Sequence, residues 1–368
     1  MKVGIMTMHR VENYGSYLQA YGLKKVIESM GHSVEFVDYE VGGTLSLHST
    51  FSKRKIMYKL KNSFKMILPS YRKYRSQQIH LNQTFSDFCN AYRNNFLPEI
   101  GVYSEKNYCA KVDTLIIGSD EVFNCTQNNQ SVGFSRQLFG KDNRADCLIS
   151  YAASFGSTTL QKLNDYGIAE EIKQNLERFN GISVRDKNSV EIVESLCNVI
   201  PIKNIDPVLL YEFQEINDIN IDKDNYIIVY AYAGRISDKE ANEIRRFAEK
   251  NNKKILCLGF YQPFCDEYVL ASPLEVLAYI KNADYVITDT FHGTVFSIKY
   301  QVPFATIIRN SNKEKLGDLL DTFSLNDRQV FNVKDIDNIL NMPINVEKIK
   351  NSIDAERKKS KKYLSDFL

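Results

Sequence analysis

The chain begins with a strand-helix-strand pattern, which limits its fold more than any other feature of the sequence. Residues 2–8 are an apolar run, and residues 15–30 follow as a helical segment that Gly31 is placed to end. Residues 33–37 then alternate between apolar and polar side chains, as a half-buried strand does. A crossover of this length joins parallel strands, because antiparallel neighbours need only a short hairpin. The pattern therefore predicts a parallel sheet covered by helices.

The same alternation runs through the chain and restarts after a boundary near residues 205–222. In the first half the sequence predicts strands at 112–117, 147–151, 181–184 and 199–202, and a helix at 161–179. In the second half it predicts strands at 226–231, 254–258, 285–288 and 304–308, and helices at 239–250, from Ser272 onward, and at 293–300. A chain of 368 residues exceeds one ordinary core. We therefore predict an α/β fold of two Rossmann-like domains, with a ligand cleft at the C-terminal ends of both sheets.

These boundaries divide the chain into an N-terminal domain, a C-terminal domain and a last helix. The predicted domains are residues 1–210 and 211–344, and the last helix covers residues 345–368. That helix is charged on its outside and could pack against either domain. A helical insertion into the first domain is expected at about residues 45–98.

The insertion carries an unusual basic stretch at residues 53–75, where no acidic residue interrupts the lysines and arginines. Ile56, Leu60 and Phe64 recur at helical spacing and form an apolar stripe. A basic amphipathic helix can lie on an anionic membrane surface. The alternative is a helix packed on the first domain with a solvated basic face, and the sequence leaves both interpretations open.

Composition and charge exclude several classes of protein. Hydrophobic residues make up 43% of the chain and charged residues 25%, as in globular proteins. The net charge of +2 provides no field for nucleic-acid binding. The seven cysteines include no Cys-x-x-Cys pair, which fits a reducing compartment better than a zinc site or disulfide framework. Without a signal peptide or membrane-spanning run, we expect a cytoplasmic location, with peripheral contact at the inner membrane face if the basic stretch binds there.

His292 is the strongest single candidate for chemistry. It follows the predicted strand 285–288 and precedes Gly293 and a helix. A helix N-terminus favours anions and disfavours an imidazolium, so a neutral ring would be available as a base. The alternative is a histidine that serves only as a helix cap. Asp289 could orient the ring or cap the loop, and Thr290 could be the N-cap residue.

Polar residues follow other predicted strands as well. Arg185 presents a planar fork for a carboxylate or phosphate, although it could instead pair with Asp186. Ser119 and Asp120 could bind a substrate hydroxyl, although turn capping explains an aspartate there equally well. Residues 13–16 form the loop after the first strand. Because all these loops lie at C-terminal strand ends, they are expected to converge on an interdomain site.

Motifs of other chemistries are absent from the sequence. It contains no P-loop, no His-Glu-x-x-His and no Gly-x-Ser-x-Gly. No group of carboxylates has the spacing of a metal site. We therefore expect neither a metal nor an organic cofactor.

An ordered set of segments resembles the polysaccharide pyruvyl transferase family. The segments are residues 13–23, 113–124, 150–156, 182–186, 206–210 and 288–293. The resemblance implies a fold like that of two-domain GT-B glycosyltransferases. It also implies transfer of the enolpyruvyl unit of phosphoenolpyruvate onto sugar hydroxyls as a ketal, during bacterial surface-polysaccharide biosynthesis. The first domain would lie on the acceptor side and the second on the donor side, with an acceptor carried on a polyprenyl diphosphate.

The resemblance also implies roles for individual residues. It makes His292 the acid/base residue and Arg185 a ligand of the donor anion. It places Asp120 among the polar residues that line the site from the first domain and gives it a catalytic role. The remaining predicted substrate-binding residues are Asn13, Tyr14, Gly15, Ser119, Thr290, Phe291 and Gly293.

One departure from the family pattern affects the donor site. Some members have Arg-Leu before the His-Gly pair, where this chain has Thr290 and Phe291. Another cation must then bind the donor, and Arg309, Lys313 and Lys315 follow the next predicted strand.

Two other functions fit the same architecture. A GT-B-type glycosyltransferase would use a nucleotide sugar, and a non-catalytic polysaccharide-assembly protein would release no phosphate with any acceptor. Fold alone does not separate these functions. Thermal stabilisation by phosphoenolpyruvate, but not by nucleotide sugars, would favour pyruvyl transfer.

Overall fold

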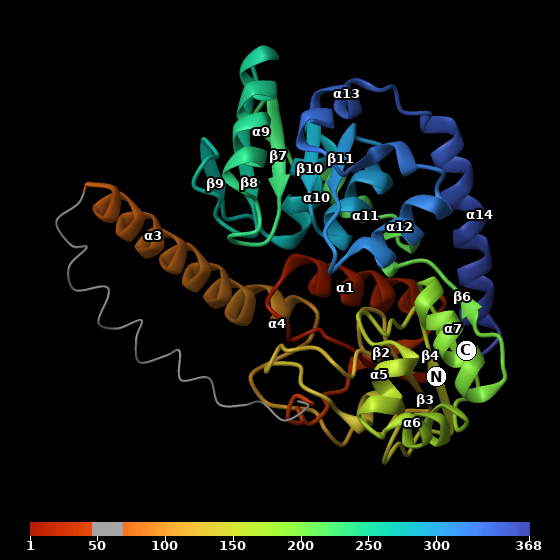
Figure 1. The fold of residues 1–368 in the computed structure, drawn as a ribbon. Coiled ribbons are helices and arrows are strands. Elements are labelled where there is room, and N and C mark those ends of the chain that lie inside the picture. The colour runs from red at the N-terminus through yellow and green to blue at the C-terminus, as the bar shows by residue number, and fades with distance from the viewer. Residues whose placement is uncertain (46–68) are drawn as a thin grey trace.

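The structure is a computed structural model that describes residues 1–45 and 69–368, with the side chains of residues 69–78 left aside. Within this described part, two α/β halves are stacked one above the other, each built on a parallel sheet (Figure 1). This confirms the predicted α/β class and the two Rossmann-like halves.

The first sheet has the strand order β2-β1-β3-β4, and all its strands are parallel. The strands are β1 (Lys2–Met6), β2 (Ser33–Phe36), β3 (Thr114–Ile117) and β4 (Cys147–Ser150). Two short strands, β5 (Ser183–Val184) and β6 (Ile202–Lys203), continue it through isolated bridges between Ile149 and Gly181 and between Ala153 and Val184. Every residue of β3 is buried, because helices cover both faces of such a sheet.

The helices of the first half differ from expectation at one place. They are α1 (Tyr14–Ser29), α3 (Pro69–Ala91), a π-helical turn (Tyr92–Phe96), α4 (Leu97–Glu99), α5 (Leu160–Asp165), α6 (Ala169–Leu176), α7 (Lys187–Cys197) and α8 (Pro207–Leu210). The single helix predicted at 161–179 is wrong. Gly167 adopts φ +67° and ends α5, with its N–H donating to the carbonyl of Asn164. Only glycine takes this left-handed conformation without strain, so the chain starts a new helix beyond it.

Helix α3 extends from the first half into solvent (Figure 1). Its C-terminal end is anchored by the buried Phe88, whose ring makes an edge contact with Tyr14. The predicted apolar stripe at Ile56, Leu60 and Phe64, and most of the basic stretch 53–75, lie outside the described residues. Membrane contact through that stretch therefore stays a prediction. No helix in the described ranges combines the length and apolar character needed to cross a bilayer.

The second sheet has the strand order β9-β8-β7-β10-β11-β12. Its strands are β7 (Tyr226–Tyr230), β8 (Lys254–Leu258), β9 (Glu267–Val269), β10 (Tyr285–Thr288), β11 (Phe304–Ile307) and β12 (Gln329–Val330). In sequence order this is 3-2-1-4-5-6, the arrangement of the Rossmann fold. The two edge strands, β9 and β12, were not predicted, because so few residues show no periodic pattern.

Helices cover the second sheet and connect it back to the first half. They are α9 (Asp238–Lys250), α10 (Pro273–Lys281), α11 (Phe291–Tyr300), α12 (Lys313–Thr322) and α13 (Ile336–Asn341). The predicted start of α10 is confirmed: Ser272 caps it in a capping box with Glu275, and Pro273 occupies the first turn. The last helix, α14 (Val346–Ser365), runs down the side of the molecule onto the first half (Figure 1).

Contacts of α14 decide which half it joins. The Tyr363 hydroxyl donates to the carbonyl of Ser150 at 2.8 Å, and the Arg357 Nε donates to the carbonyl of Leu209 at 2.6 Å. The sequence left both domains open, and the structure places this helix against the first. Helix α14 therefore packs the C-terminal segment of the chain against the N-terminal half.

Candidate functional site

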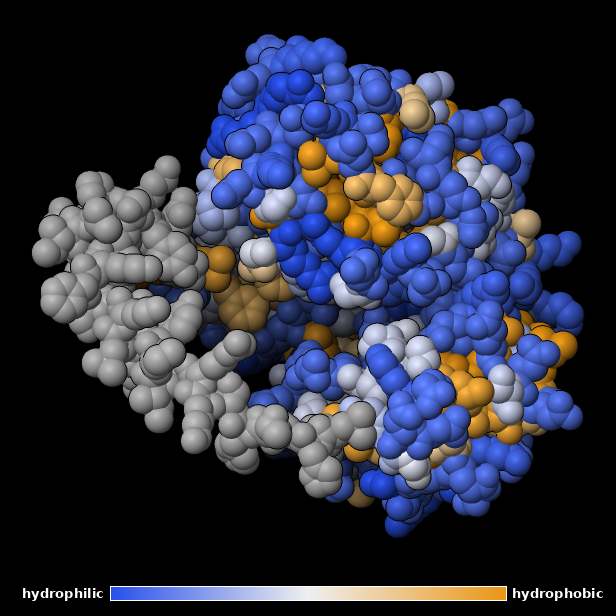
Figure 2. Space-filling model, viewed as in Figure 1, coloured by the Kyte–Doolittle hydropathy of each residue, from blue (hydrophilic) through white to orange (hydrophobic). Residues whose placement is uncertain are grey.

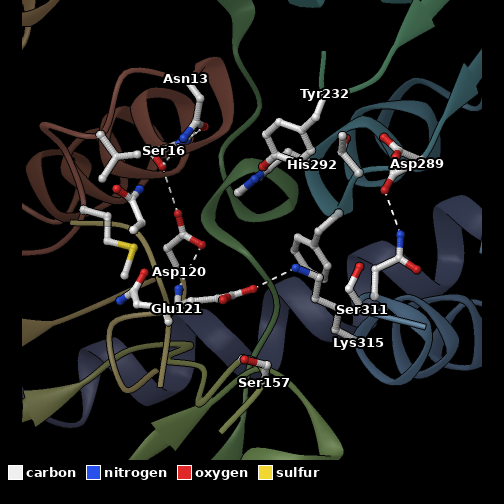
Figure 3. A pocket seen from close by; sticks show the side chains of 18 of the residues that line it. Asn13, Ser16, Asp120, Glu121, Ser157, Tyr232, Asp289, His292, Ser311 and Lys315 are labelled. Carbon is white, nitrogen blue, oxygen red and sulfur yellow. Dashed lines mark hydrogen bonds and ion pairs between the residues drawn. The ribbon is translucent and has the colours of Figure 1, made fainter. Parts of the chain in front are cut away.

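A cavity of about 820 Å³ lies between the two halves. In the second sheet it opens beside the ends of β7 and β10, where the strand order reverses, and in the first beside the ends of β1 and β3. Open α/β sheets bind ligands at such switch points, because the loops diverge there. Figure 2 shows the hollow between the halves, and Figure 3 shows the side chains that extend into it.

His292 lies in the first turn of α11 and lines this cavity. The helix begins at Phe291 rather than at Gly293, so the predicted start was two residues late. The predicted N-cap is confirmed: the Thr290 hydroxyl accepts a hydrogen bond from the Gly293 N–H at 2.9 Å. Gly293 packs so tightly that a Cβ there would lie 2.2 Å from the Thr288 hydroxyl oxygen. The local sequence thus fixes the backbone that carries the imidazole.

The partner of the His292 ring is Asp206, not Asp289. The His292 Nε2 lies 3.5 Å from the Asp206 Oδ2, and Asp206 is the N-cap residue of α8 in the other half. Asp289 is buried and lies nearest to Arg235 and Arg309. The suggested role of Asp289 in orienting the ring is therefore wrong, because its carboxylate faces the two arginines instead.

Arg185 connects the two aspartates of the site. Its Nη1 donates to the Asp206 Oδ2 at 2.9 Å, and its Nη2 donates to the Asp120 Oδ1 at 3.1 Å. The guanidinium also lies 4.2 Å from the centre of the Phe291 ring, within cation–π range. Only 3% of the side chain is exposed. Arg185 therefore holds a buried network together, and both of its terminal nitrogens are already bound to carboxylates.

The network sets the charge of its members. Burial by itself would raise the pKa of the Asp206 carboxyl, but His292 and Arg185 together hold that pKa below its ordinary value. The pKa of the Asp120 carboxyl is lowered in the same way, against burial, chiefly by the positive charge of Arg185. Both aspartates are therefore ionised at neutral pH and keep Arg185 and His292 in place.

Asp120 also connects the network to the first helix. Its Oδ2 accepts a hydrogen bond from the Ser16 hydroxyl at 3.0 Å (Figure 3), and Ser16 lies in the first turn of α1. Asp120 adopts φ +81°, a left-handed conformation that costs a non-glycine residue energy. Such strain persists where surrounding contacts hold a side chain in a required position. Asp186, the other candidate partner of Arg185, instead caps α7 by accepting from the Ser189 N–H.

The predicted site residues divide into two groups. Those that line the cavity are Asn13, Asp120, Arg185, Thr290, Phe291 and His292. Those that lie outside its lining are Tyr14, Gly15, Ser119, Gly293, Arg309 and Lys313. The residues of the first group lie in the loops that follow the strands or, for Phe291 and His292, in the first helical turn beyond. Those of the second group are buried beneath the cavity lining or lie outside the cavity.

The residues outside the lining have identifiable other contacts. Tyr14 donates to the carbonyl of Ala271 across the two halves, and the Ser119 hydroxyl accepts from the Asp120 N–H. Arg309 binds both carboxylate oxygens of Glu240. Lys313 is exposed at the start of α12. These four residues are therefore not in direct reach of a ligand in the cavity.

A comparison with protein families identifies the lineage of the chain. Residues 13–312 match the model described as "Polysaccharide pyruvyl transferase". The chain belongs to this family. A search of curated proteins finds no match.

Solved structures similar to this family member share little sequence with it. A UDP-GlcNAc 2-epimerase from Methanocaldococcus jannaschii, in complex with UDP-GlcNAc and UDP, has a TM-score of 0.48 at 12% identity, covering 100% of this chain and 99% of that one. The UDP-GlcNAc 2-epimerase from Neisseria meningitidis has 0.47 at 10%, covering 98% and 100%. The glycosyltransferase SsfS6 of Streptomyces sp. SF2575 has 0.47 at 11%, covering 98% and 96%.

Three residues in or beside the cavity of this pyruvyl transferase family member were missed by sequence reasoning or given no role. Asp206 stands in a segment of the resemblance, but its contact with His292 depends on how the halves pack. Glu121 accepts from the Lys315 Nζ at 2.7 Å across the cavity (Figure 3), so Lys315 is in the site but already paired. Arg235 lies just after β7, a strand end like the others, and the same reasoning could have found it.

Replacing Gly15 with alanine is expected to disturb His292 directly. A Cβ at this position would lie 2.2 Å from the His292 Nδ1 and 2.3 Å from its Cγ, so the ring must move. A displacement of about 1 Å can reduce turnover about 100-fold. Steady-state transfer measurements on Gly15→Ala would test this expectation.

Gly317→Ala is the matched control, because a Cβ there would meet nothing within 4 Å and the residue also lies in a helix. Alanine is the better helix former at both positions, so a difference between the two variants reflects the clash at Gly15 and not helix propensity. Equal activity of the two variants would show that the position of the His292 ring does not matter.

Proposed function

We propose that this chain transfers the pyruvyl unit of phosphoenolpyruvate to two hydroxyls of a sugar, as a cyclic ketal, in bacterial surface-polysaccharide biosynthesis. The observation that carries the proposal is the position of His292. Its imidazole lines an interdomain cavity, contacts an ionised aspartate, and stands within the segment that matches the family. A positioned imidazole of this kind can give and take a proton.

The proposed reaction needs one acid/base group and no organic cofactor. His292 donates a proton to the methylene carbon of the donor, which leaves an oxocarbenium-like centre at the adjacent carbon. An acceptor hydroxyl attacks that carbon and gives up its proton to the imidazole. The bond to the phosphate oxygen then breaks, phosphate leaves, and a second hydroxyl closes the ketal while its proton goes to the phosphate. Asp206 lies 3.5 Å from the His292 Nε2 and positions the ring.

The cavity supplies an environment that suits a doubly anionic donor. The N-cap residues of α1, α11 and α12, which are Asn13, Thr290 and Asn312, all line it. The first turn of a helix carries N–H groups without intrahelical partners and a partial positive charge. Helices that begin at one cavity therefore attract phosphate or carboxylate groups.

Arg235 is the best candidate among the described residues for the cation that the donor needs. Four cations of the described ranges line the cavity. Arg185 and Lys315 are hydrogen-bonded to carboxylates, and Lys162 donates to the carbonyl of Ser157. Within those ranges, the one carboxylate contact of Arg235 is with Asp289, at 3.8 Å. Its side chain is 40% exposed. Burial raises the pKa of the Asp289 carboxyl, although Arg235 and Arg309 oppose this. We propose that Arg235 takes the place of the arginine that some family members carry before the His-Gly pair.

Arg235→Met is expected to raise the KM for phosphoenolpyruvate about 10–100-fold, the effect of losing one or two charge-assisted hydrogen bonds. The turnover number should change less, because His292 is untouched. Arg246→Met is the matched control, since that arginine is 65% exposed and pairs with Glu243 on the same helix. An unchanged donor KM in Arg235→Met would show that another group binds the anion.

The acceptor is proposed to be a sugar carried on a polyprenyl diphosphate. The direct test incubates the protein with phosphoenolpyruvate and a panel of lipid-linked sugars. Phosphate release is measured together with a product mass equal to acceptor plus pyruvic acid minus one water. Phosphoenolpyruvate should also raise the melting temperature, and nucleotide sugars alone should not. Stabilisation by nucleotide sugars instead would favour glycosyl transfer, and no phosphate release with any acceptor would favour an assembly role.

A further inference from the structure

Three aromatic rings form a continuous strip along the cavity wall. Tyr232 and Phe260 have ring centroids 5.3 Å apart, and Phe260 and Phe85 have centroids 6.0 Å apart with planes only 17° from parallel. All three residues line the cavity. At a 6.0 Å separation near-parallel rings are offset, so part of each face stays open to a ligand.

The exposure of these rings sets them apart from core aromatics. Tyr232 is 40% exposed and Phe85 is 43% exposed, although each stands beside a cavity rather than on an open surface. Leaving aromatic area in contact with water costs free energy that burial would recover. A ligand that covered these rings would therefore gain free energy from the burial of aromatic surface, at the place where a ligand is expected.

The strip joins segments from both halves of the molecule. Tyr232 follows β7 and Phe260 follows β8, whereas Phe85 belongs to α3 of the first half. His80 of α3 makes a second contact of the same kind, an edge-on approach to Tyr261 with centroids 4.5 Å apart. A ligand on the strip would therefore touch both halves at once.

Polar side chains line the cavity from the first half as well. Asn13, Gln127 and Asn129 present amide groups there. Amides both donate and accept hydrogen bonds, as sugar hydroxyls require. A pyranose ring carries C–H groups on its faces and hydroxyls at its rim, so its faces match an aromatic strip and its rim matches amides. The three-carbon donor carries a carboxylate and, on the next carbon, a phosphate, so it is dominated by charge and gains little from aromatic contact.

We propose that Tyr232, Phe260 and Phe85 form the stacking platform that binds the acceptor hexopyranose, which rests on the proposed function. The platform places the acceptor against both halves, rather than against the first domain alone as the sequence had implied. Arg235 lies 4.7 Å from the centre of the Tyr232 ring, so the donor cation adjoins the platform. Donor and acceptor would thus meet beside Tyr232, in the cavity that His292 lines (Figure 3).

Saturation-transfer NMR with a panel of methyl hexopyranosides, including methyl β-galactopyranoside, tests the platform without any turnover. Irradiation of the protein aromatic protons should saturate the ring C–H protons of at least one glycoside. Tyr232→Leu and Phe260→Leu should weaken that binding at least tenfold, whereas Tyr232→Phe should retain it, because the ring and not the hydroxyl stacks. Phe331→Leu is the control, since Phe331 is 71% exposed and outside the cavity lining.

The outcomes separate this inference from the proposed function. Loss of glycoside binding in the leucine variants supports the platform even if no phosphate is released with phosphoenolpyruvate. Where transfer does occur, Phe260→Leu should raise the KM for the acceptor about 10-fold or more and leave the donor KM unchanged, because the Arg235 guanidinium lies over the Tyr232 ring and not over that of Phe260. Absence of saturation transfer to every glycoside, equal transfer in all variants, or displacement of the glycoside by UMP would overturn the proposal.

Discussion

Substitution of His292 by glutamine is expected to lower pyruvyl transfer about 10²–10⁴-fold, the contribution of a positioned acid/base group. Glutamine keeps a polar side chain in the first turn of α11 but cannot exchange a proton near neutral pH. The reduction should appear in the turnover number, because the imidazole acts on the reacting carbon after the donor has bound. Initial rates of phosphate release, measured at saturating donor and acceptor, would show it.

The His292 variant needs a control for folding and a control for histidine loss in general. The His292 Nε2 makes no hydrogen bond within the described residues, and glutamine is also polar and of similar length, so the melting temperature should fall little. His32→Gln should retain full activity, because His32 follows the C-terminal end of α1, whereas the cavity-lining loop precedes the N-terminal end of that helix. Near-normal turnover of a folded His292→Gln protein would remove His292 from the mechanism.

Substitution of Arg185 by methionine is expected to destabilise the protein by about 3–5 kcal/mol at neutral pH, the cost of breaking a buried ion pair. The guanidinium is 3% exposed and binds Asp206 and Asp120, which would be left as two buried carboxylates without a cation. Methionine fills similar volume, so the loss would reflect charge more than packing. Urea unfolding followed by circular dichroism would measure the change.

The pH dependence of that loss identifies its cause. In the native protein the pKa values of Asp120 and Asp206 lie below their ordinary value of 3.8, so their contribution is present above pH 3.8 and is lost as the pH falls below it. Without Arg185, burial and mutual repulsion should raise both pKa values, that of Asp120 more than that of Asp206, because His292 remains beside Asp206. Protonation of these carboxyls would then remove buried charge from the variant. The difference in unfolding free energy between the variant and the native protein should therefore shrink as the pH falls from 7 toward about 4.

Arg178→Met is the matched control for this experiment. Arg178 is exposed and has no ion pair within the described residues, so its loss should change stability by less than about 0.5 kcal/mol at any of these pH values. A loss of stability in Arg185→Met that is independent of pH would indicate a packing defect instead of uncompensated charge.

The sequence predicted the fold where strands are buried on both faces. The strands predicted at 254–258 and 285–288 coincide with β8 and β10, because a strand inside a parallel sheet appears as an uninterrupted apolar run. Short edge strands such as β12 have two residues and no period to detect. The break at Gly167 was missed because a glycine within a helical pattern is compatible with either continuation or an end.

The sequence alone also determined which loops form the site. His292, Asp120 and Arg185 each follow a strand, and parallel strands place their C-terminal ends at one edge of a sheet, so these residues could be expected to converge. What only the tertiary structure decided is how they are paired. Asp206, rather than Asp289, contacts His292, and Gly15 leaves room for its ring. These contacts join residues from different halves of the chain, and they depend on how two separately folded sheets dock, which no local pattern records.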